Sequence, residues 1–397
     1  MSLSGRDGLG GRAAVVGVGA TEFSKDSGRS ELRLAVEAVR AALADAGLTP
    51  ADVDAMVTFT MDTSPEITVA QAAGIGELSF FSRVHYGGGA ACATVQQAAL
   101  AIAAGVADVV VCYRAFNERS GRRFGSGVRH REPSAEGAAL GWSLPFGLLT
   151  PASWVAMAAQ RYLHTYGVDW ERVARVAVTI RNHGHANPEA VMHGRGPYTI
   201  DDVMAAPRIA EPFGRLDLCL ANEGAAAMVI TSEARARDLD RPVVRIVGGG
   251  CEWHRQQYVQ PARYEDVGMI GTDAARRAFE ASGLTHEDLD VLEVYDVNSF
   301  EVVRQLEVLG FCRQGEGADF LDDTDISRAG DLPINTDGGL MSHSHIGWGA
   351  PTLRIVEAVR QLRGEAGDRQ VPGARTAMAG GAGSGAQYYN LLLLQAD

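Results

Sequence analysis

Lysine is almost absent from this sequence of 397 residues: of its 36 basic residues only Lys25 is a lysine, and the others are arginines. A Schiff-base mechanism needs a lysine amine that burial can deprotonate. Lys25 stands in the polar segment FSKDSGRS, which offers nothing to desolvate it. The sequence therefore argues against a mechanism through a lysine imine.

Positive charge and long apolar runs are also scarce. The 36 basic residues face 49 acidic ones, a formal net charge of -13, and such a surface repels phosphate backbones and anionic lipid. No apolar run approaches the roughly 18 to 20 residues that cross a bilayer, and the N-terminus lacks the pattern of a signal peptide. We therefore expect a cytoplasmic protein with no membrane span and no nucleic-acid partner.

Metal-ligand patterns are missing too. The cysteines are odd in number and form no C-x-x-C pair, so neither a disulfide framework nor a zinc ribbon is indicated, and most should be reduced core thiols. Two H-x-H pairs lack a third ligand at metal spacing, so we expect no metal site. The cysteines are Cys92, Cys112, Cys219, Cys251 and Cys312, and the histidine pairs are His183 with His185 and His343 with His345.

An internal repeat dominates what is present. Residues 35–57 and 271–293 both contain Gly-Leu-Thr followed by Asp-x-Asp and an aliphatic residue, at an offset of 236 positions. Each copy predicts a helix that ends at a glycine, then a capped turn and a strand. A glycine-bounded apolar strand precedes each copy, AAVVGVGA at 13–20 and VVRIVGGG at 243–250. The pattern indicates a gene duplication.

Strands alternate with helices along both repeats, which predicts an α/β fold with mainly parallel sheets. We place the two halves at residues 1–242 and 243–397. Within the first half the pattern loosens between about 113 and 215, and we interpret this stretch as an insertion that covers an active site.

Four segments, in order, carry a resemblance to a known family: RIAEPFGRLDLCLANEGAAAMVITS, EVYDVNSFEVVRQLEVLG, INTDGGLMSHSHIGWGAP and AMAGGAGSG. Over nearly its whole length the chain resembles the thiolase superfamily, in its lipid-transfer, sterol-carrier branch, and most of all the actinobacterial steroid side-chain-cleaving aldolases. The resemblance implies a duplicated, five-layered α-β-α-β-α fold, a homodimer, and a substrate carried as a coenzyme A thioester.

The two cysteines of thiolase chemistry have no clear counterparts. Thiolases place the attacking cysteine where a helix N-terminus favours the thiolate, and the family spacing puts Gly88 there. Cys92 lies one helical turn later, so we interpret it as a small core residue, with a nucleophilic role as the alternative. The second family cysteine aligns with Met378, which cannot transfer a proton.

Two acid-base candidates stand in family positions. His345 matches the histidine that hydrogen-bonds the thioester oxygen, and Tyr295 falls where the family orients a catalytic water or proton; packing under a loop is the alternative for Tyr295. We expect both on opposite lips of one pocket, at the carboxyl ends of strands, with Gly88 as a third wall. The predicted substrate-binding residues are Gly88, Asn298, Gly381 and Gly383. Six arginines in residues 114–131 suit the phosphates of coenzyme A or a solvated interface loop.

Without an acyl-enzyme, the chemistry that remains is retro-aldol cleavage of a β-hydroxyacyl-CoA, with coenzyme A as part of the substrate and no other cofactor. His345 and glycine-loop amides would stabilise the enolate, and Tyr295 would take the hydroxyl proton or return one to Cα. The resemblance implies a 17-hydroxy steroid with a three-carbon side-chain thioester, cleaved to a 17-keto steroid and propionyl-CoA. The alternatives are an acyl-CoA thiolase that uses Cys92 and a non-catalytic subunit that binds acyl-CoA or lipid.

The resemblance also implies a partner. Members of the aldolase group work with a DUF35 protein, an OB-fold with a zinc ribbon, and this sequence holds no such cysteine-rich domain. The partner would therefore be a separate chain in a heterotetramer. We expect the homodimer to form through the first half, with the apolar strand VADVVVCY (106–113) closing a sheet across the two-fold axis.

Overall fold

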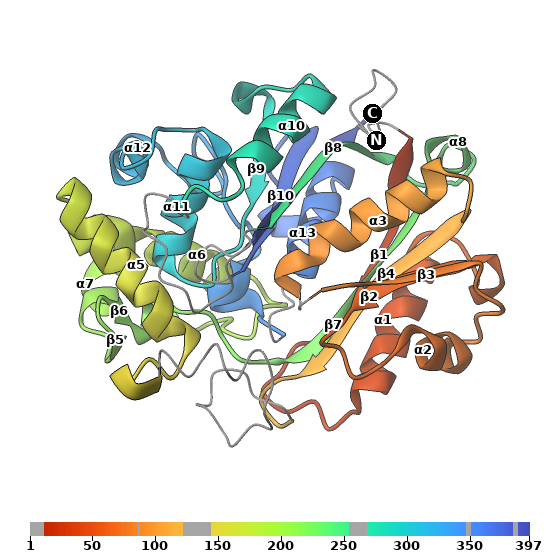
Figure 1. The fold of residues 1–397 in the computed structure, drawn as a ribbon, viewed down its shortest axis with the longest axis horizontal. Helices are drawn as coiled ribbons and strands as arrows, with labels where there is room; N and C mark the ends of the chain where they lie inside the picture. Colours follow the sequence, from red (N-terminus) through yellow and green to blue (C-terminus); the bar gives the residue numbers. More distant parts are fainter. Residues whose placement is uncertain (1–11, 86–87, 122–143, 254–267, 347–350, 384–387) are drawn as a thin grey trace.

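The computed structural model describes residues 12–85, 88–121, 144–253, 268–346, 351–383 and 388–397. One sheet of nine strands runs through the molecule in the order β3-β2-β4-β7-β1-β8-β11-β10-β9 (Figure 1). The strands are β1 (Ala13–Ala20), β2 (Ala55–Phe59), β3 (Phe80–Val84), β4 (Val109–Asn117), β7 (Glu223–Ser232), β8 (Val244–Trp253), β9 (Val291–Glu293), β10 (Thr376–Ala382) and β11 (Tyr388–Ala396).

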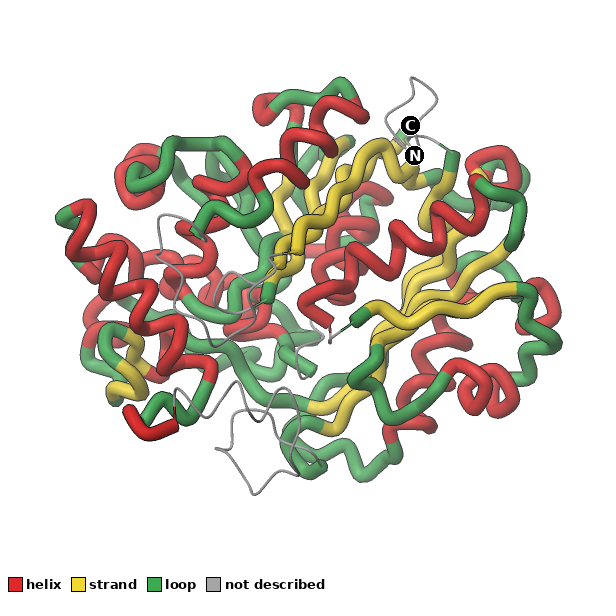
Figure 2. Tube along the Cα trace, in the orientation of Figure 1, coloured by secondary structure: helices red, strands yellow, loops and turns green. Residues whose placement is uncertain are grey.

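Helices cover both faces of this sheet (Figure 2). Among the described residues, no helix is both long and apolar enough to cross a bilayer. The helices are α1 (Glu31–Asp45), α2 (Glu66–Ala73), α3 (Ala91–Ala103), α5 (Pro151–Tyr166), α6 (Trp170–Ala186), α7 (Ile200–Met204), α8 (Glu233–Ala236), α10 (Thr272–Ser282), α11 (Ser299–Leu309), α12 (Gly317–Asp323) and α13 (Pro351–Arg363).

The layers follow from which helices touch which strands. The alanine-rich α3 and its neighbour α13 contact strands of both halves of the sheet and form the central layer (Figure 1). On the outside, α1 packs on β1, β4 and β7, and α10 packs on β8 and β11. The order of layers is therefore α-β-α-β-α, and the predicted five-layered fold is confirmed. The prediction of mainly parallel strands is wrong, because five of the eight neighbouring pairs in this sheet are antiparallel and three are parallel.

Glycines in β1 and β8 explain how closely the outer helices approach the sheet. A Cβ atom at Gly17 would overlap the backbone carbonyl oxygen of Ala42 in α1. In the second half, a Cβ atom at Gly250 would overlap the carbonyl oxygen of Ala274 in α10 in the same way. Both glycine-bounded strands of the sequence thus serve the same purpose, namely close contact between a strand and a helix backbone.

The turns that follow the two outer helices are also alike. Thr49 donates its backbone N–H to Asp52 over 2.9 Å, and Thr285 donates to Asp288 over 2.7 Å. Each pair forms a capping box at the start of a short 3₁₀ turn that leads into a strand. The repeated Gly-Leu-Thr segment therefore folds the same way twice.

The segment between β4 and β7 leaves the first half and packs on the second. β4 extends through Asn117, beyond residue 113, and the chain then continues to α5, α6, α7 and the short hairpin of β5 (Arg208–Ala210) and β6 (Phe213–Gly214). Helix α6 contacts α11, α12 and the turn at Gly339–His343. Arginines 122, 123, 129 and 131 of the predicted phosphate-binding run lie outside the described residues.

The prediction that VADVVVCY closes a sheet across a two-fold axis is wrong. Its residues 109–113 belong to β4, and β4 is an inner strand that hydrogen-bonds to β2 on one side and to β7 on the other. The edge strand of the first half is β3, which pairs with β2 alone. The apolar run is explained by burial on both faces, which an edge position does not require.

We predict that Gly17→Ala destabilises the fold by about 1–3 kcal/mol, because the added methyl group pushes β1 away from the α1 backbone. Gly76→Ala is the matched control, since a Cβ atom at Gly76 would meet no atom within 4 Å. Urea unfolding of the two variants measures the difference. Equal unfolding midpoints would contradict the close-packing role of Gly17.

Candidate active site

Residues 218–222, which join the inserted segment to β7, run between two loops of the second half. One is the loop from β9 to α11, which holds Tyr295, and the other is the loop before α13, which holds His345. Three backbone hydrogen bonds fix this strand-like path: Cys219 N–H to Val297 C=O (3.0 Å), Leu220 N–H to Leu340 C=O (3.0 Å) and Asn222 N–H to His345 C=O (3.0 Å). The structure therefore links the loops of Tyr295 and His345 through a third segment.

Arg181 of α6 forms hydrogen bonds to the segments that meet here. Its guanidinium, which is buried, donates to the carbonyl oxygens of Leu216 (2.6 Å), Leu218 (2.9 Å) and Met341 (2.9 Å). A guanidinium has five donors in a rigid fork, so one side chain can hold several backbone acceptors at once. The inserted segment and the His345 loop are thus held together by α6.

His345 is a buried cation. Its Nδ1 lies 3.1 Å from the carbonyl oxygen of Leu220 and 3.4 Å from the carboxylate of Glu118. Burial alone would lower the pKa of His345, but the Cys219 thiol and the Glu118 carboxylate outweigh it and raise this pKa well above 6.5. At neutral pH the ring is therefore an imidazolium that donates protons, which suits stabilisation of an oxyanion.

Tyr295 follows β9 and is almost fully buried, with 2% of its surface exposed. Its backbone is fixed by Gln305 of α11, which accepts from the Tyr295 N–H (3.0 Å) and donates to its carbonyl oxygen (2.7 Å). The ring belongs to the apolar core of the second half, together with Phe300 and Met378. A packing role for Tyr295 is evident, and its proton-transfer role stays a prediction.

The next residues along the Tyr295 loop are structural. Asp296 is buried and its carboxylate accepts from the backbone N–H groups of Leu340 (2.9 Å) and Met341 (3.3 Å), which holds the two loops together. Asn298 is the N-cap of α11: its side-chain oxygen accepts from the Glu301 N–H over 2.9 Å. The structure gives Asn298 a capping role, and its substrate-binding role stays a prediction.

The predicted glycines meet at Asn390 of β11. Its side-chain NH₂ group donates to the carbonyl oxygen of Gly89, next to Gly88, over 2.7 Å and to that of Gly381 over 2.8 Å. Gly88 begins a short 3₁₀ turn, Gly88–Ala90, at the start of α3. Gly383 donates its N–H to Tyr388 C=O over 3.0 Å, and residues 384–387 of the glycine loop lie outside the described part.

Cys92 is placed as a core residue. Its side chain is fully buried in α3, and the thiol donates to the carbonyl oxygen of Ala379 in β10 over 3.2 Å. Burial raises the pKa of this thiol well above 9.0, which opposes formation of a thiolate. Met378, at the position of the second family cysteine, is buried in β10 and belongs to the apolar core of the second half. The geometry favours the core interpretation of Cys92 over the nucleophilic one.

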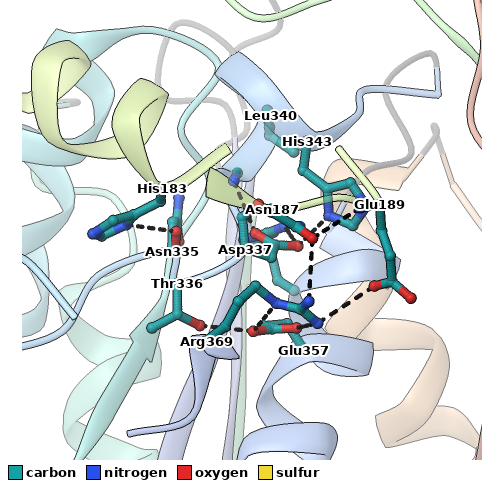
Figure 3. Close-up of polar contacts among 12 residues, drawn as sticks. His183, Asn187, Glu189, Asn335, Thr336, Asp337, Leu340, His343, Glu357 and Arg369 are labelled. Carbon is teal, nitrogen blue, oxygen red and sulfur yellow. Dashed lines mark hydrogen bonds and ion pairs between the residues drawn. The ribbon is translucent and has the colours of Figure 1, made fainter. Parts of the chain in front are cut away.

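A buried ionic network holds the loop that carries His343 and His345, and Figure 3 shows its contact between Asp337 and His343. Arg354 of α13 forms ion pairs with Glu293 and, over 2.6 Å, with Asp337. Asp337 in turn lies 2.5 Å from Nδ1 of His343 and accepts from the Gly339 N–H over 2.8 Å. Burial would raise the pKa of Asp337, but Arg354 and His343 hold it well below 3.8.

A second set of contacts continues this network below Asp337. Glu357 pairs with Arg369 over 3.1 Å and accepts from the hydroxyl of Thr336 over 2.9 Å (Figure 3). Arg369 also donates to Asn187 over 3.1 Å. The inserted segment, α13 and the Asp337 loop are therefore joined by buried polar contacts that the hydrophobic pattern of the sequence does not reveal.

The histidines of the two H-x-H pairs point to different partners. His343 contacts Asp337 while His345 contacts Leu220 and Glu118, and His183 lies 3.1 Å from the Asn335 carbonyl oxygen. His185 accepts from the Gly196 N–H over 2.9 Å. Within the described residues no group of three or more His, Cys, Asp or Glu residues is arranged to hold a metal ion.

Two cavities of about 830 Å³ each border these loops. The first lies between the segment 20–25, residues 188–195 and α13, and its wall includes Asp337 and His343. The second lies along residues 205–222, and its wall includes Cys219. Both volumes are in the range of small-molecule sites, and the cavities adjoin because Lys25, Val191 and Arg195 line both.

The predicted single pocket compares with these cavities as follows. The loops of Tyr295 and His345 are brought together, whereas Gly88 lies with Gly381 near Asn390. Neither Tyr295, His345 nor Gly88 is among the residues that line the two cavities. The prediction that Gly88 forms the third wall of a Tyr295–His345 pocket therefore stays a prediction. The sequence did not single out Cys219 or Glu118, because their contacts with His345 are long-range. It did not single out Asp337 either, because the orientation of this carboxylate depends on Arg354.

We predict that N-ethylmaleimide modifies Cys219 first in the folded chain, because Cys219 borders a cavity. Cys92 and Cys112 are fully buried, and burial raises the pKa of Cys251 and Cys312 to about 12. Peptide mass mapping after brief labelling measures the order, with Cys219→Ser as the control that should lose the first label. Labelling of Cys92 before Cys219 would contradict the structure.

Comparisons with known proteins agree with this architecture. The thiolase N-terminal domain family matches residues 13–234, and the thiolase C-terminal domain-like family matches residues 257–396. A steroid side-chain-cleaving aldolase of Thermomonospora curvata is 48% identical over 394 residues, which cover 97% of this chain and 98% of the relative. A 17-hydroxy-3-oxo-4-pregnene-20-carboxyl-CoA lyase of Mycobacterium tuberculosis is 51% identical over 365 residues, 90% and 92% of the two chains.

A solved structure extends the comparison to three dimensions. The Ltp2-ChsH2(DUF35) aldolase superimposes with a TM-score of 0.89 at 46% sequence identity, over 98% of this chain and 99% of that one. Family and fold agree over both halves of the repeat, as the four sequence motifs predict. The chain belongs to the thiolase superfamily and shares the architecture of its steroid side-chain-cleaving aldolases.

Proposed function

We propose that this chain is a carbon–carbon lyase that cleaves a β-hydroxyacyl-CoA by a retro-aldol reaction. The substrate class is a 17-hydroxy steroid with a three-carbon side-chain thioester, and the products are a 17-keto steroid and propionyl-CoA. The observation that carries the proposal is the position of Cys92, whose buried, hydrogen-bonded thiol leaves thiolase acyl transfer without its nucleophile. The names of the two relatives that are about half identical support the same chemistry.

His345 and the glycine loop serve the thioester end of the substrate. Breaking the Cα–Cβ bond leaves its electron pair on the thioester as an enolate, so the oxygen needs a donor. His345 is held as an imidazolium and can supply it, together with backbone amides near Gly381 and Gly383. Tyr295 takes the hydroxyl proton or returns one to Cα, and the net reaction changes no oxidation state.

The second cavity suits the phosphates of coenzyme A. Its wall carries Lys25, Arg119, Arg195 and Arg215 against one carboxylate, that of Asp202. In a chain of net charge -13, such a cluster attracts an anion by its local field. Arginine forks also match phosphate geometry. Coenzyme A arrives as part of the substrate, and the proposed reaction needs no other cofactor and no metal.

We further propose that the enzyme acts as a cytoplasmic heterotetramer of two copies of this chain and two copies of a separate DUF35 protein. The resemblance to the Ltp2-ChsH2(DUF35) aldolase supports the partner. The five cysteines are all unpaired, which suits a reducing compartment. Strand β3 supports the homodimer, because it is a sheet edge and its Phe81 is 55% exposed.

Product analysis tests the reaction. We expect the purified chain, alone or with the DUF35 partner, to convert a 17-hydroxy steroid CoA thioester to equal amounts of 17-keto steroid and propionyl-CoA, measured by mass spectrometry. Tyr295→Phe should lower kcat by roughly 10²–10⁴, because it keeps the ring but removes the proton carrier.

Cys92→Ala is the matched control, because it should cost only packing, on the order of 1 kcal/mol, and keep turnover. A folded Cys92→Ala variant without activity beside an active Tyr295→Phe variant would restore the thiolase interpretation. No turnover of any thioester, with or without the partner, would favour a non-catalytic binding subunit.

The dimer has its own test. We expect Phe81→Lys to shift the chain from dimer to monomer in sedimentation at micromolar concentration, since a charge on an edge strand opposes strand pairing. Ile67→Lys is the control, because Ile67 of α2 is equally exposed, at 58%, but lies off the sheet edge. A Phe81→Lys variant that stays dimeric would place the interface elsewhere.

A further inference from the structure

His343 has the geometry of a general base, although neither the sequence motifs nor the proposed mechanism uses it. Its imidazole is 4% exposed, lies in the wall of the first cavity and has Nδ1 2.5 Å from Asp337 (Figure 3). Its other nitrogen, Nε2, is buried and makes no hydrogen bond with any atom of the described residues. A buried, unpartnered nitrogen at a cavity wall is costly unless a ligand uses it.

The contacts of Asp337 decide which nitrogen carries the proton. Arg354 holds one oxygen of Asp337 as a carboxylate, and the Gly339 N–H donates to the other. A carboxylate can only accept, so Nδ1 of His343 is the donor in their contact. Nε2 is therefore the nitrogen left to accept a proton, and Asp337 stabilises the positive charge of the ring that results.

The position of His343 connects it to the proposed reaction. Its loop also holds His345, and the extended Ser344 separates the two histidines. Phe23 packs edge-on against His343, with ring centroids 5.4 Å apart, while the next residue, Ser24, accepts a hydrogen bond from the Asn222 side chain. The segment 20–25 thus packs on His343 and is linked to His345 through Asn222, and its Lys25 lines both cavities.

The proposed reaction lacks a suitable acceptor for the hydroxyl proton. A phenol has an ordinary pKa of about 10, so the neutral Tyr295 is a weak base near pH 7. The Cys219 and Glu118 side chains raise the pKa of His345 well above 6.5, so near pH 7 this ring suits a donor better than an acceptor. The His343 imidazole lines the first cavity, its Nε2 has no hydrogen-bond partner among the described residues, and an imidazole has the right chemistry for a base.

We propose that His343, oriented by Asp337, is a further catalytic residue: the general base that accepts the β-hydroxyl proton of the substrate through Nε2. This inference rests on the proposed function. The O–H electron pair becomes the second bond of the ketone, and the Cα–Cβ pair moves to the thioester enolate. Tyr295 then gives its proton to Cα, and the proton taken up by His343 returns through solvent to the Tyr295 phenolate, so atoms and charge balance and both side chains are regenerated.

The experiment compares His343→Gln with the wild type, using the steroid CoA thioester and the full chain with its partner. We expect kcat to fall by roughly 10²–10⁴ while KM changes far less, because glutamine keeps polarity and size but cannot accept the proton. Imidazole added to His343→Ala should restore part of the rate. The rise of kcat/KM with pH on the acid side, which reports deprotonation of the base, should be absent in His343→Gln.

Other charged groups around the first cavity also shape this pH profile, so a matched variant is needed. They are Glu22, Lys25, Glu189, Arg195, Glu357 and Arg360, in addition to Asp337. His183→Gln removes a buried histidine of the same polar network that does not line the cavity, and it should keep both kcat and the acid limb.

Each outcome decides the inference. A His343→Gln variant that keeps kcat and the acid limb overturns the role of His343 and leaves the lyase assignment intact. Equal losses in His343→Gln and His183→Gln, without imidazole rescue, show a structural role and also overturn it. A wild-type chain that releases no 17-keto steroid overturns the proposed function, and the role of His343 with it.

Discussion

The buried guanidinium of Arg354 is the constraint on which the site depends. It lies in the central helix α13 and pairs with Glu293 at the end of β9 and with Asp337 at the start of the histidine loop, and all three side chains are at most 1% exposed. Two carboxylates that share one cation repel each other, so ionising both of them costs free energy. Burial and the nearby Asp337 and Glu357 charges raise the pKa of Glu293, whereas Arg354 and His343 hold that of Asp337 low.

Loss of one partner from such a buried group costs about 3–5 kcal/mol, because the other charge is left uncompensated. The position of the histidines is thereby tied to the stability of the core.

The inserted segment acts through the same loops. Arg181 donates hydrogen bonds to the carbonyl groups of residues 216, 218 and 341. Residues 218–222 add backbone hydrogen bonds to the loops that hold Tyr295 and His345. A segment that belongs to the first half in sequence therefore completes the site of the second half. This arrangement explains why the repeat is imperfect between β4 and β7. The inserted helices pack on α11 and α12, and these contacts have no symmetric counterpart.

Patterns among residues close in the sequence made the fold predictable, whereas contacts between residues far apart in the sequence limited prediction of the site. Gly17 and Gly250 mark the strands that touch helix backbones, and the Thr49 and Thr285 capping boxes follow from three-residue spacings that any sequence shows directly. The position of β4 inside the sheet could not be read in the same way, because an apolar run is compatible with an inner or an edge strand.

His343 illustrates the limit for the site. Its partner Asp337 is only six residues away, but Asp337 is oriented by Arg354, and the cavity beside them is built from residues 20–25 and 188–195. No spacing rule connects those segments. The H-x-H pattern, which lacks a third metal ligand, therefore does not reveal the opposite proton roles that we propose for its two histidines.

Those opposite roles follow from electrostatics alone. His345 faces an acidic neighbour and a thiol, and its pKa is raised, so it holds a proton at neutral pH and can donate to an enolate oxygen. His343 faces a carboxylate that also pairs with Arg354, and its second nitrogen has no hydrogen-bond partner among the described residues. In the mechanism that we propose, one loop supplies the two groups that a retro-aldol cleavage needs: a donor where the thioester becomes negative and an acceptor where the hydroxyl becomes a ketone. A thiolase needs instead a thiolate at the α3 N-terminus, and there Cys92 is turned into the core towards Ala379. One fold can therefore support either reaction. The difference can arise from which buried side chains stay charged and which stay neutral.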